Sequence, residues 1–212
     1  MSLRTYSYKV IRQIKILSPF SEFMGAFIVL GGLLLCLFSK TSLHLFINGY
    51  HSSYGDIFFT HATLLGDGIS ASLIVVILLF VNYRFAAAMA VSNVLCAVII
   101  QSLKRTIFAD SVRPIQFFHG IHVLYLVPGV EIYSFNSFPS GHSATIFTTC
   151  TILSLLSERQ IVRGFLFGTA CFIAFSRVYL SQHFFEDIYT GAIIGFCVAV
   201  LTAAIFDQEK YN

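Results

Sequence analysis

The amino-acid sequence predicts an all-α integral membrane protein, built as a bundle of six transmembrane helices. Hydrophobic residues make up 57% of the 212 residues and charged residues only 11%, whereas soluble domains usually contain about 25% charged residues. Six apolar runs also approach the roughly 20 residues that a helix needs to cross a bilayer. These observations exclude a disordered chain, a coiled coil, a nucleic-acid-binding protein and an ordinary cytosolic enzyme.

The six runs define one membrane domain over residues 23–206, between an N-terminal segment of residues 1–22 and a tail of residues 207–212. The basic N-terminal segment either acts as a topology signal or forms a short amphipathic helix at the membrane surface. No small-residue cleavage site follows the first run, so we expect this helix to be retained. Asp67 is expected to cap the second span. The predicted spans are Phe23–Phe38, Ala62–Val81, Phe85–Leu103, Ser143–Ser157, Ile161–Phe175 and Ile188–Phe206.

The distribution of Lys and Arg predicts the orientation of the bundle. Six spans place both termini on one side of the membrane. Eight basic residues fall on that side: Arg4, Lys9, Arg12, Lys15, Arg84, Arg159, Arg163 and Lys210. Five fall on the other: Lys40, Lys104, Arg105, Arg113 and Arg177. Because cytoplasmic loops are enriched in Lys and Arg, we expect cytoplasmic termini. The long third loop, residues 104–142, then lies on the periplasmic or extracellular face of a cytoplasmic (inner) membrane.

Three polar clusters lie at the outer ends of the apolar runs, where ionisable groups are costly and usually functional. The first contains Lys104, Arg105 and Arg113, followed by Pro114, just after the third run. These cations form either an interfacial basic patch that touches lipid head groups or part of an anion-binding site.

The second cluster is the sequence Pro139-Ser140-Gly141-His142 at the start of the fourth run. Ser and Gly at a helix N-terminus leave backbone N–H groups free, and the helix dipole favours an anion there. A histidine beside such a site can donate a proton to a departing oxygen. The alternative is a helix cap with an incidental histidine.

The third cluster joins Arg177 to His183 and Asp187, which are four residues apart. On a helix this spacing brings two side chains together. A carboxylate bonded to one imidazole nitrogen fixes the tautomer and leaves the other nitrogen free to attack. The planar guanidinium of Arg177 suits phosphate oxygens. The alternative is a surface ion pair with a capping histidine.

All three clusters lie at the same membrane face under the predicted topology, so they can converge. Together they can bind a tetrahedral oxyanion, attack it and protonate a leaving group. A zinc site would need three or four closely arranged ligands, whereas the cysteines lie in apolar runs and the two best histidines have other roles. We therefore expect no metal and no cofactor.

These residues resemble the motifs of the type 2 phosphatidic acid phosphatase (PAP2) family, membrane lipid phosphatases that share a fold with vanadium haloperoxidases. The family has three signatures: Lys, six residues, Arg-Pro; then Pro-Ser-Gly-His; then Ser-Arg, five residues, His, three residues, Asp. The second matches at 139–142 and the third at 176–187. The first departs, because eight residues separate Lys104 from Arg113-Pro114, and Arg105 is a rival for the Lys position. The resemblance covers about residues 60–206.

The resemblance implies a role for each matching residue. It makes His183 the nucleophile that forms a phosphohistidine, Asp187 its orienting partner and His142 the acid and base. The implied phosphate-binding residues are Lys104 (or Arg105), Arg113, Arg177, Ser140 and the backbone N–H of Gly141.

We therefore expect a metal-independent membrane hydrolase of lipid phosphates, whose partners are the bilayer and the substrate lipid and not nucleic acid. Candidate substrates are phosphatidylglycerol phosphate, phosphatidate, undecaprenyl pyrophosphate and a lipid A phosphate. One alternative is a phosphotransferase that passes the phosphoryl group to a second lipid. Others are a vanadate-dependent haloperoxidase and a non-catalytic transporter or assembly factor. Intact His142, His183 and Asp187 argue against a non-catalytic protein.

Overall fold

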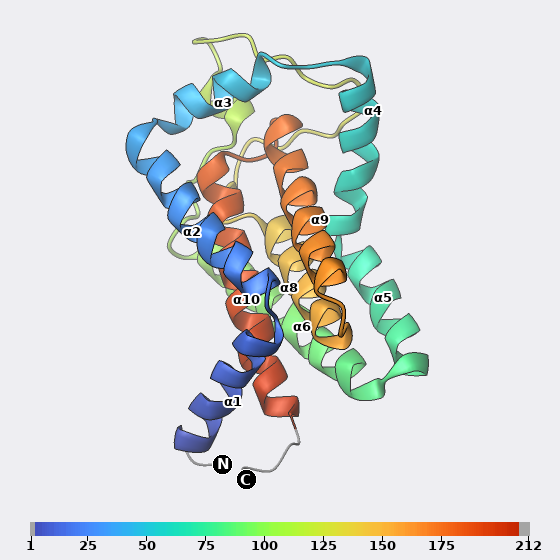
Figure 1. Cartoon of the computed structure of the whole chain (residues 1–212). Helices are drawn as coiled ribbons and strands as arrows, with labels where there is room; N and C mark the ends of the chain where they lie inside the picture. Colours follow the sequence, from blue (N-terminus) through green and yellow to red (C-terminus); the bar gives the residue numbers. More distant parts are fainter. Residues whose placement is uncertain (1–2, 208–212) are drawn as a thin grey trace.

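The computed structural model describes residues 3–207. In this part of the chain the regular structure is helical apart from one isolated bridge between Val112 and Phe135, so the predicted all-α class is confirmed. Figure 1 shows a bundle with both termini at one end and α3 at the other. The helices are α1 (Leu3–Ile16), α2 (Phe20–Leu37), α3 (Lys40–Asn48), α4 (Ser53–Ala62), η1 (Thr63–Gly66), α5 (Gly68–Val81), α6 (Tyr83–Arg105), α7 (Pro114–Phe117), α8 (Gly141–Leu156), α9 (Gln160–Tyr179) and α10 (Phe185–Phe206).

The number of membrane spans differs from the prediction. Within the described residues, four helices are long and apolar enough to cross a bilayer, namely α2, α6, α9 and α10. A fifth span results if α4 and η1 are joined to α5 across a bend of 56°. The remaining predicted span is α8, which has only 16 residues. The prediction of integral membrane helices therefore holds, whereas the count of six is not exact.

The short helix α8 is surrounded mainly by other helices of the protein. It packs most extensively on α10 and also contacts α9 and α6. Ten of its residues are buried, among them Thr148, Thr149 and Thr151. A helix enclosed by other helices need not be continuously apolar or span the full hydrocarbon thickness. The first turn of α8 lies inside the bundle, where Ser143 and Ala144 are buried.

The predicted second span, Ala62–Val81, is broken at Asp67. The chain turns between η1 and α5, and the Asp67 carboxylate accepts a 2.6 Å hydrogen bond from the Gly68 backbone N–H. The expected capping role of Asp67 is thus confirmed for α5. A Cβ on Gly66 would lie 3.3 Å from the His142 carbonyl oxygen. The break therefore brings the backbone of η1 directly against the start of α8.

Two glycines allow the backbone of α10 to approach the backbone of α8 closely. A Cβ on Gly191 would lie 2.4 Å from the Ser140 carbonyl oxygen, and one on Gly195 would lie 2.3 Å from the Ala144 carbonyl oxygen. Small residues four apart on one helix face allow such backbone contact between membrane helices. This contact fixes the start of α8 relative to the first turns of α10.

Candidate active site

A buried histidine–carboxylate pair lies between α9 and α10, at the end of the bundle opposite the termini. His183 Nδ1 lies 3.2 Å from Asp187 Oδ2, and the two side chains are 2% and 1% exposed. The same carboxylate oxygen accepts the Phe184 backbone N–H at 2.9 Å in the first turn of α10. One carboxylate therefore caps the helix and orients the imidazole. A proton held on Nδ1 leaves the lone pair of Nε2 available as a nucleophile.

Ser137 completes this arrangement, and the sequence analysis missed it. Its hydroxyl donates to Asp187 Oδ2 at 2.5 Å, and the Ser140 backbone N–H donates to the Asp187 carbonyl oxygen at 3.0 Å. Hydrogen bonds to a charged acceptor are stronger than neutral ones. The loop before α8 is therefore fastened to the residue that orients His183.

The turn that carries His183 is shaped by backbone contacts to Arg177. The Arg177 carbonyl oxygen accepts the N–H groups of Gln182 and His183 at 2.9 and 3.1 Å. Ser181 adopts a left-handed conformation with φ of 54°, and its hydroxyl oxygen accepts a 3.1 Å hydrogen bond from Asn48 on α3. These contacts hold the nucleophile candidate on a fixed turn between two helices.

Three predicted cations are buried at this site, with exposed fractions of 8% for Lys104, 9% for Arg113 and 8% for Arg177. The Lys104 ammonium donates to the Asn136 carbonyl oxygen at 2.7 Å. The Arg113 guanidinium donates to the Gln182 carbonyl oxygen at 3.0 Å. Burial of a cation is costly unless it finds partners of opposite charge. The partners of Lys104 and Arg113 are neutral carbonyl oxygens rather than carboxylates, which is the arrangement expected of an anion site.

The guanidinium of Arg177 has an unused donor. One terminal nitrogen donates to the Thr63 hydroxyl at 2.8 Å, whereas the buried Nε has no hydrogen-bond partner within residues 3–207. An unsatisfied buried donor needs an explanation, and a bound anion or an ordered water can provide one. Thr63 is a second residue that the sequence analysis missed.

The cations also act on His183. Burial first, and then the charges of Arg113, Arg177 and Lys104, hold the pKa of His183 well below its usual value. His142 contributes in the same direction. Burial likewise lowers the pKa of Arg113, partly offset by the negative charge of Asp187. The structure brings the three motifs together, since Arg113 donates to the carbonyl oxygen of Gln182, beside His183, and the Ser140 backbone N–H donates to the Asp187 carbonyl oxygen.

The irregular first motif is accommodated by a turn after α6. Lys104 is buried, whereas its neighbour Arg105 is exposed at the last turn of the helix. The additional residues lie in turns 106–111, where the Phe108 backbone N–H donates to the Leu103 carbonyl oxygen at 2.9 Å. Lys104 and Arg113 donate to the neighbouring carbonyl oxygens of Asn136 and Phe135, so the structure favours Lys104 over Arg105 for this position.

The Pro-Ser-Gly-His motif forms the N-terminus of α8. Ser140 is the N-cap residue, and its hydroxyl oxygen accepts from the Ser143 backbone N–H at 3.4 Å and from its hydroxyl at 3.1 Å. Ser140 therefore retains only its own hydroxyl proton for an anion. Gly141 and His142 lie in the first turn, where backbone N–H groups have no partner within the helix. A cavity of about 180 Å³ lies beside His142 and is also lined by Asp67.

No group of three or more His, Cys, Asp and Glu side chains is arranged to hold a metal ion within residues 3–207. The charged and titratable groups at this site are the three cations, the two histidines and the Asp187 carboxylate.

Comparison with known proteins agrees with this geometry. The model of the PAP2 superfamily matches residues 84–211. A lipid A 4'-phosphatase of Bacteroides thetaiotaomicron is 28% identical over 161 residues, covering 73% of this chain and 71% of its own. A lipid A 1-phosphatase of Rhizobium johnstonii is 32% identical over 104 residues, a match that spans 49% of this chain and only 41% of that protein.

Two crystal structures are similar to the fold. Aquifex aeolicus LpxE has a TM-score of 0.69 and 28% identity, with 77% of this chain and 93% of that chain covered. A transmembrane PAP2 type phosphatidylglycerolphosphate phosphatase from Bacillus subtilis has a TM-score of 0.65, with 93% and 96% covered. Its identity of 20% supports the fold alone.

The fold and the site thus define an enzyme class, the membrane lipid phosphatases. The chain belongs to the PAP2 superfamily, and the resemblance drawn from its motifs is confirmed.

Proposed function

We propose that the protein removes a phosphate group from a lipid phosphate or pyrophosphate without a metal ion, by way of a phosphohistidine at His183. The observation that carries this proposal is the buried His183–Asp187 pair facing three buried cations, one of which has an unused donor. Phosphoryl transfer is catalysed mainly by positioning and by stabilisation of charge on the equatorial oxygens.

In the first step, Nε2 of His183 attacks phosphorus and the bond from phosphorus to the lipid oxygen breaks. Protonated His142 gives its proton to the departing oxygen. Lys104, Arg113 and Arg177 balance the charge on the phosphoryl oxygens, with the N–H of Gly141 and the hydroxyl of Ser140. Asp187 keeps the His183 proton on Nδ1 and stabilises the positive charge that develops on the imidazole.

In the second step, His142 takes a proton from a water molecule whose oxygen attacks the phosphohistidine. The phosphorus–nitrogen bond breaks, inorganic phosphate leaves, and His183 is neutral again. The two steps replace one difficult displacement by two easier ones.

The relatives favour a lipid A type phosphate among the candidate substrates. Two of them are lipid A phosphatases that act at different positions of lipid A, the 1-phosphate and the 4'-phosphate. We infer the same substrate class here, with the acyl chains in the bilayer and the phosphate at the His183 end of the bundle. This end is proposed to face the outside, with both termini in the cytoplasm.

The test is phosphate release by the purified, detergent-solubilised protein in the presence of EDTA. The panel contains lipid A, phosphatidylglycerol phosphate, phosphatidate, undecaprenyl pyrophosphate and a soluble phosphomonoester, with the His183→Ala variant as the control. We expect release that survives EDTA, is fastest with lipid A and falls by at least 1,000-fold in the variant. Phosphorylated lipid without free phosphate would instead indicate a phosphotransferase, and loss of activity with EDTA would contradict the metal-free mechanism.

A further inference from the structure

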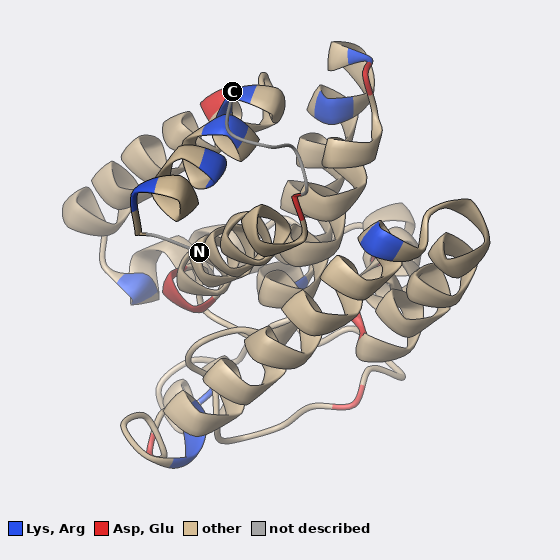
Figure 2. Cartoon of the chain, turned by 90° about the horizontal axis from the view of Figure 1, so that it is seen from below, with Lys and Arg blue, Asp and Glu red and all other residues tan. Residues whose placement is uncertain are grey.

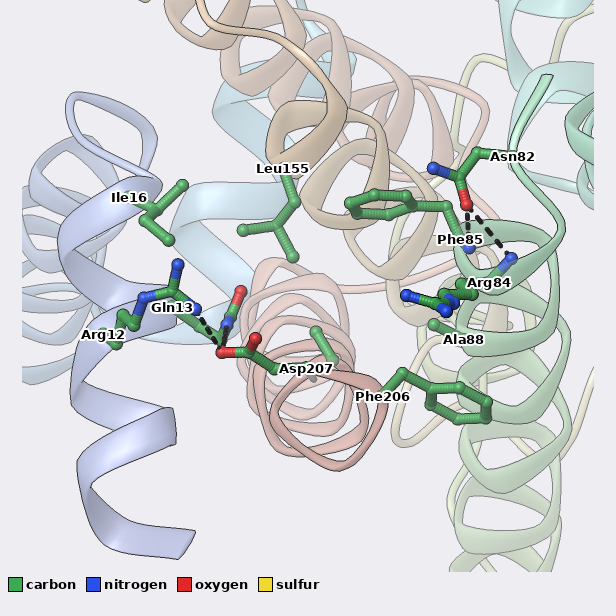
Figure 3. Close-up of a pocket in the computed structure, with 11 residues that line it drawn as sticks. Arg12, Gln13, Ile16, Asn82, Arg84, Phe85, Ala88, Leu155, Phe206 and Asp207 are labelled. Atoms are coloured by element: carbon green, nitrogen blue, oxygen red, sulfur yellow. Dashed lines mark hydrogen bonds and ion pairs between the residues drawn. The ribbon is translucent and has the colours of Figure 1, made fainter. Parts of the chain in front are cut away.

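A second pocket lies at the opposite end of the bundle, next to the termini. It has a volume of about 420 Å³ and opens between α1, α6, α8 and α10. Figure 3 shows Arg12 and Gln13 of α1 on one side, Asn82 and Arg84 at the start of α6 on the other, and the end of α10 between them. None of these residues belongs to the site around His183.

One side of this pocket is held together by Asp207. Its carboxylate pairs with the Arg12 guanidinium at 2.5 Å and accepts from the Gln13 side chain at 2.8 Å. The Lys9 ammonium donates to the Asp207 carbonyl oxygen. Asp207, the residue that follows α10, therefore meets two cations of α1: Arg12 at its carboxylate and Lys9 at its backbone carbonyl oxygen.

The other side carries a cation without a counter-charge. Arg84 forms no ion pair with a carboxylate of residues 3–207; its Nε donates to the Tyr83 hydroxyl at 3.2 Å, and its guanidinium carbon lies 5.6 Å from that ring. Its terminal nitrogens are available to a ligand. Among the described residues that line the pocket, Arg84 is the cation outside the Arg12–Asp207 pair, and a guanidinium is suited to bidentate contact with phosphate oxygens.

The remaining walls are apolar. They comprise Ile16, Phe85, Ala88, Leu155, Ala203 and Phe206. A soluble ion would use only the charged rim of such a pocket, whereas an amphiphile would use the rim and the walls together. Basic pockets between transmembrane helices are known places for anionic lipid head groups.

We propose that this pocket binds the head group of an anionic phospholipid from the leaflet at the terminal end of the bundle. The phosphodiester would lie against the Arg84 guanidinium, and an acyl chain would lie along Phe85 and Leu155. Such a lipid contacts α1, α6 and α8 at once, so it fastens the N-terminal helix to the bundle. This binding is separate from substrate turnover, since the residues involved are not those at His183.

The experiment is native mass spectrometry of the purified full chain with phosphatidylglycerol or phosphatidylcholine of identical acyl chains. The His183→Ala variant serves as the background, so that turnover does not alter the lipid. We expect one phosphatidylglycerol to bind at least 5-fold more tightly than phosphatidylcholine. Arg84→Gln should remove this preference, and Asp207→Asn should increase it. Because Arg84 is exposed, its replacement leaves the packed interior intact.

The matched control is Arg159→Gln, which removes an exposed cation at the same end of the bundle but outside the pocket. It should leave the preference unchanged. An equal loss in Arg84→Gln and Arg159→Gln would overturn the proposal in favour of general charge attraction. Absence of any preference would overturn it directly. Displacement of the lipid by millimolar inorganic phosphate would also overturn it, because the site would then select a soluble ion.

Discussion

At the residue scale, the site consists of charged and polar side chains that are buried although burial of such groups is costly. Three cations lie at 8–9% exposure; carbonyl oxygens are the main partners of Lys104 and Arg113, and the Thr63 hydroxyl is a partner of Arg177. A single carboxylate, Asp187, accepts from Ser137, from a backbone N–H and from His183. In the proposed mechanism a phosphate dianion offsets the free-energy cost of burying these cations, which would link substrate binding to charge stabilisation in the reaction.

The sequence predicted the charged and titratable residues of this site but not the residues that hydrogen-bond to them. His183 and Asp187 share a local spacing, and His142 belongs to a compact motif, so both could be recognised in the chain. Ser137 and Thr63 act from 50 and 114 residues away. A short hydroxyl side chain fits many environments, so such a contact leaves no pattern in the sequence.

The choice between Lys104 and Arg105 gives the first prediction. Lys104→Met removes a buried cation that faces the phosphate, and we expect kcat/KM to fall by 100-fold or more, roughly 3 kcal/mol of transition-state stabilisation. Arg105→Met alters an exposed side chain and should change kcat/KM less than 3-fold. Steady-state kinetics of both variants provide the measurement. Equal losses, or loss only in Arg105→Met, would contradict the assignment of Lys104.

The pH dependence of activity gives the second prediction. Because burial and three cations lower the pKa of His183, its imidazole stays neutral well below pH 6.5. The fraction of protonated, inactive nucleophile rises only as the pH falls through this lowered pKa. After correction for ionisation of the substrate, kcat/KM should therefore decrease on the acid side only well below pH 6.5.

The Arg113→Gln variant provides the control for this prediction. Removing one of the cations should raise the pKa of His183 and move the acid limb of its residual activity to higher pH. An acid limb of the wild-type enzyme at 6.5 or above, with no movement in Arg113→Gln, would show that these charges do not govern the nucleophile.

At the scale of the elements, the contact of α8 with α10 positions the proposed catalytic groups. The start of α8 carries His142, and the start of α10 carries Asp187. Gly191 and Gly195 let the two backbones meet. The active geometry therefore depends on residues that take no part in the chemistry.

Substitution of these glycines gives the third prediction. Gly191→Ala would place a methyl group 2.4 Å from the Ser140 carbonyl oxygen, so α8 must move. We expect a destabilisation of about 1–3 kcal/mol and a loss of activity larger than that of stability. The matched control is Gly168→Ala in α9, where a Cβ meets nothing within 4 Å. Thermal unfolding in detergent and phosphate release measure both effects, and an unaltered Gly191→Ala enzyme would contradict the account.

The sequence predicted the helices better than their breaks and lengths. Hydropathy detects composition, so it located α2, α6, α9 and α10, but it cannot detect a change of direction. The bend at Asp67 depends on packing of Gly66 against His142, a contact between distant segments. The short α8 combines polar and apolar residues because it is enclosed by protein, whereas a hydropathy window assumes a lipid surrounding.

At the scale of the whole molecule, the two ends of the bundle differ in chemistry. Figure 2 looks onto the end with both termini and shows Lys and Arg on α1 and around neighbouring helix ends. The buried cations of the site lie at the other end. This asymmetry is the physical basis for the proposed orientation, with the site on the outer face.

Cysteine labelling provides the fourth prediction. In a protein whose native cysteines are replaced by alanine, Val123→Cys would expose a thiol in the long loop, where Val123 is fully exposed. A membrane-impermeant maleimide should label it in spheroplasts or intact cells. Arg159→Cys, at the terminal end, should be labelled only after permeabilisation. The reverse pattern would place the site in the cytoplasm.

The most direct test of the central claim is to trap the phosphorylated enzyme. In the His142→Ala variant, an aryl phosphate should still phosphorylate the protein, because its leaving group needs no proton, whereas attack of water on the intermediate is slowed. We predict one acid-labile, base-stable phosphate per protein molecule, located on His183 by mass spectrometry and absent in His142→Ala combined with His183→Ala. Continued turnover without such a phosphoryl group, or a phosphoryl group on another residue, would contradict the proposed mechanism.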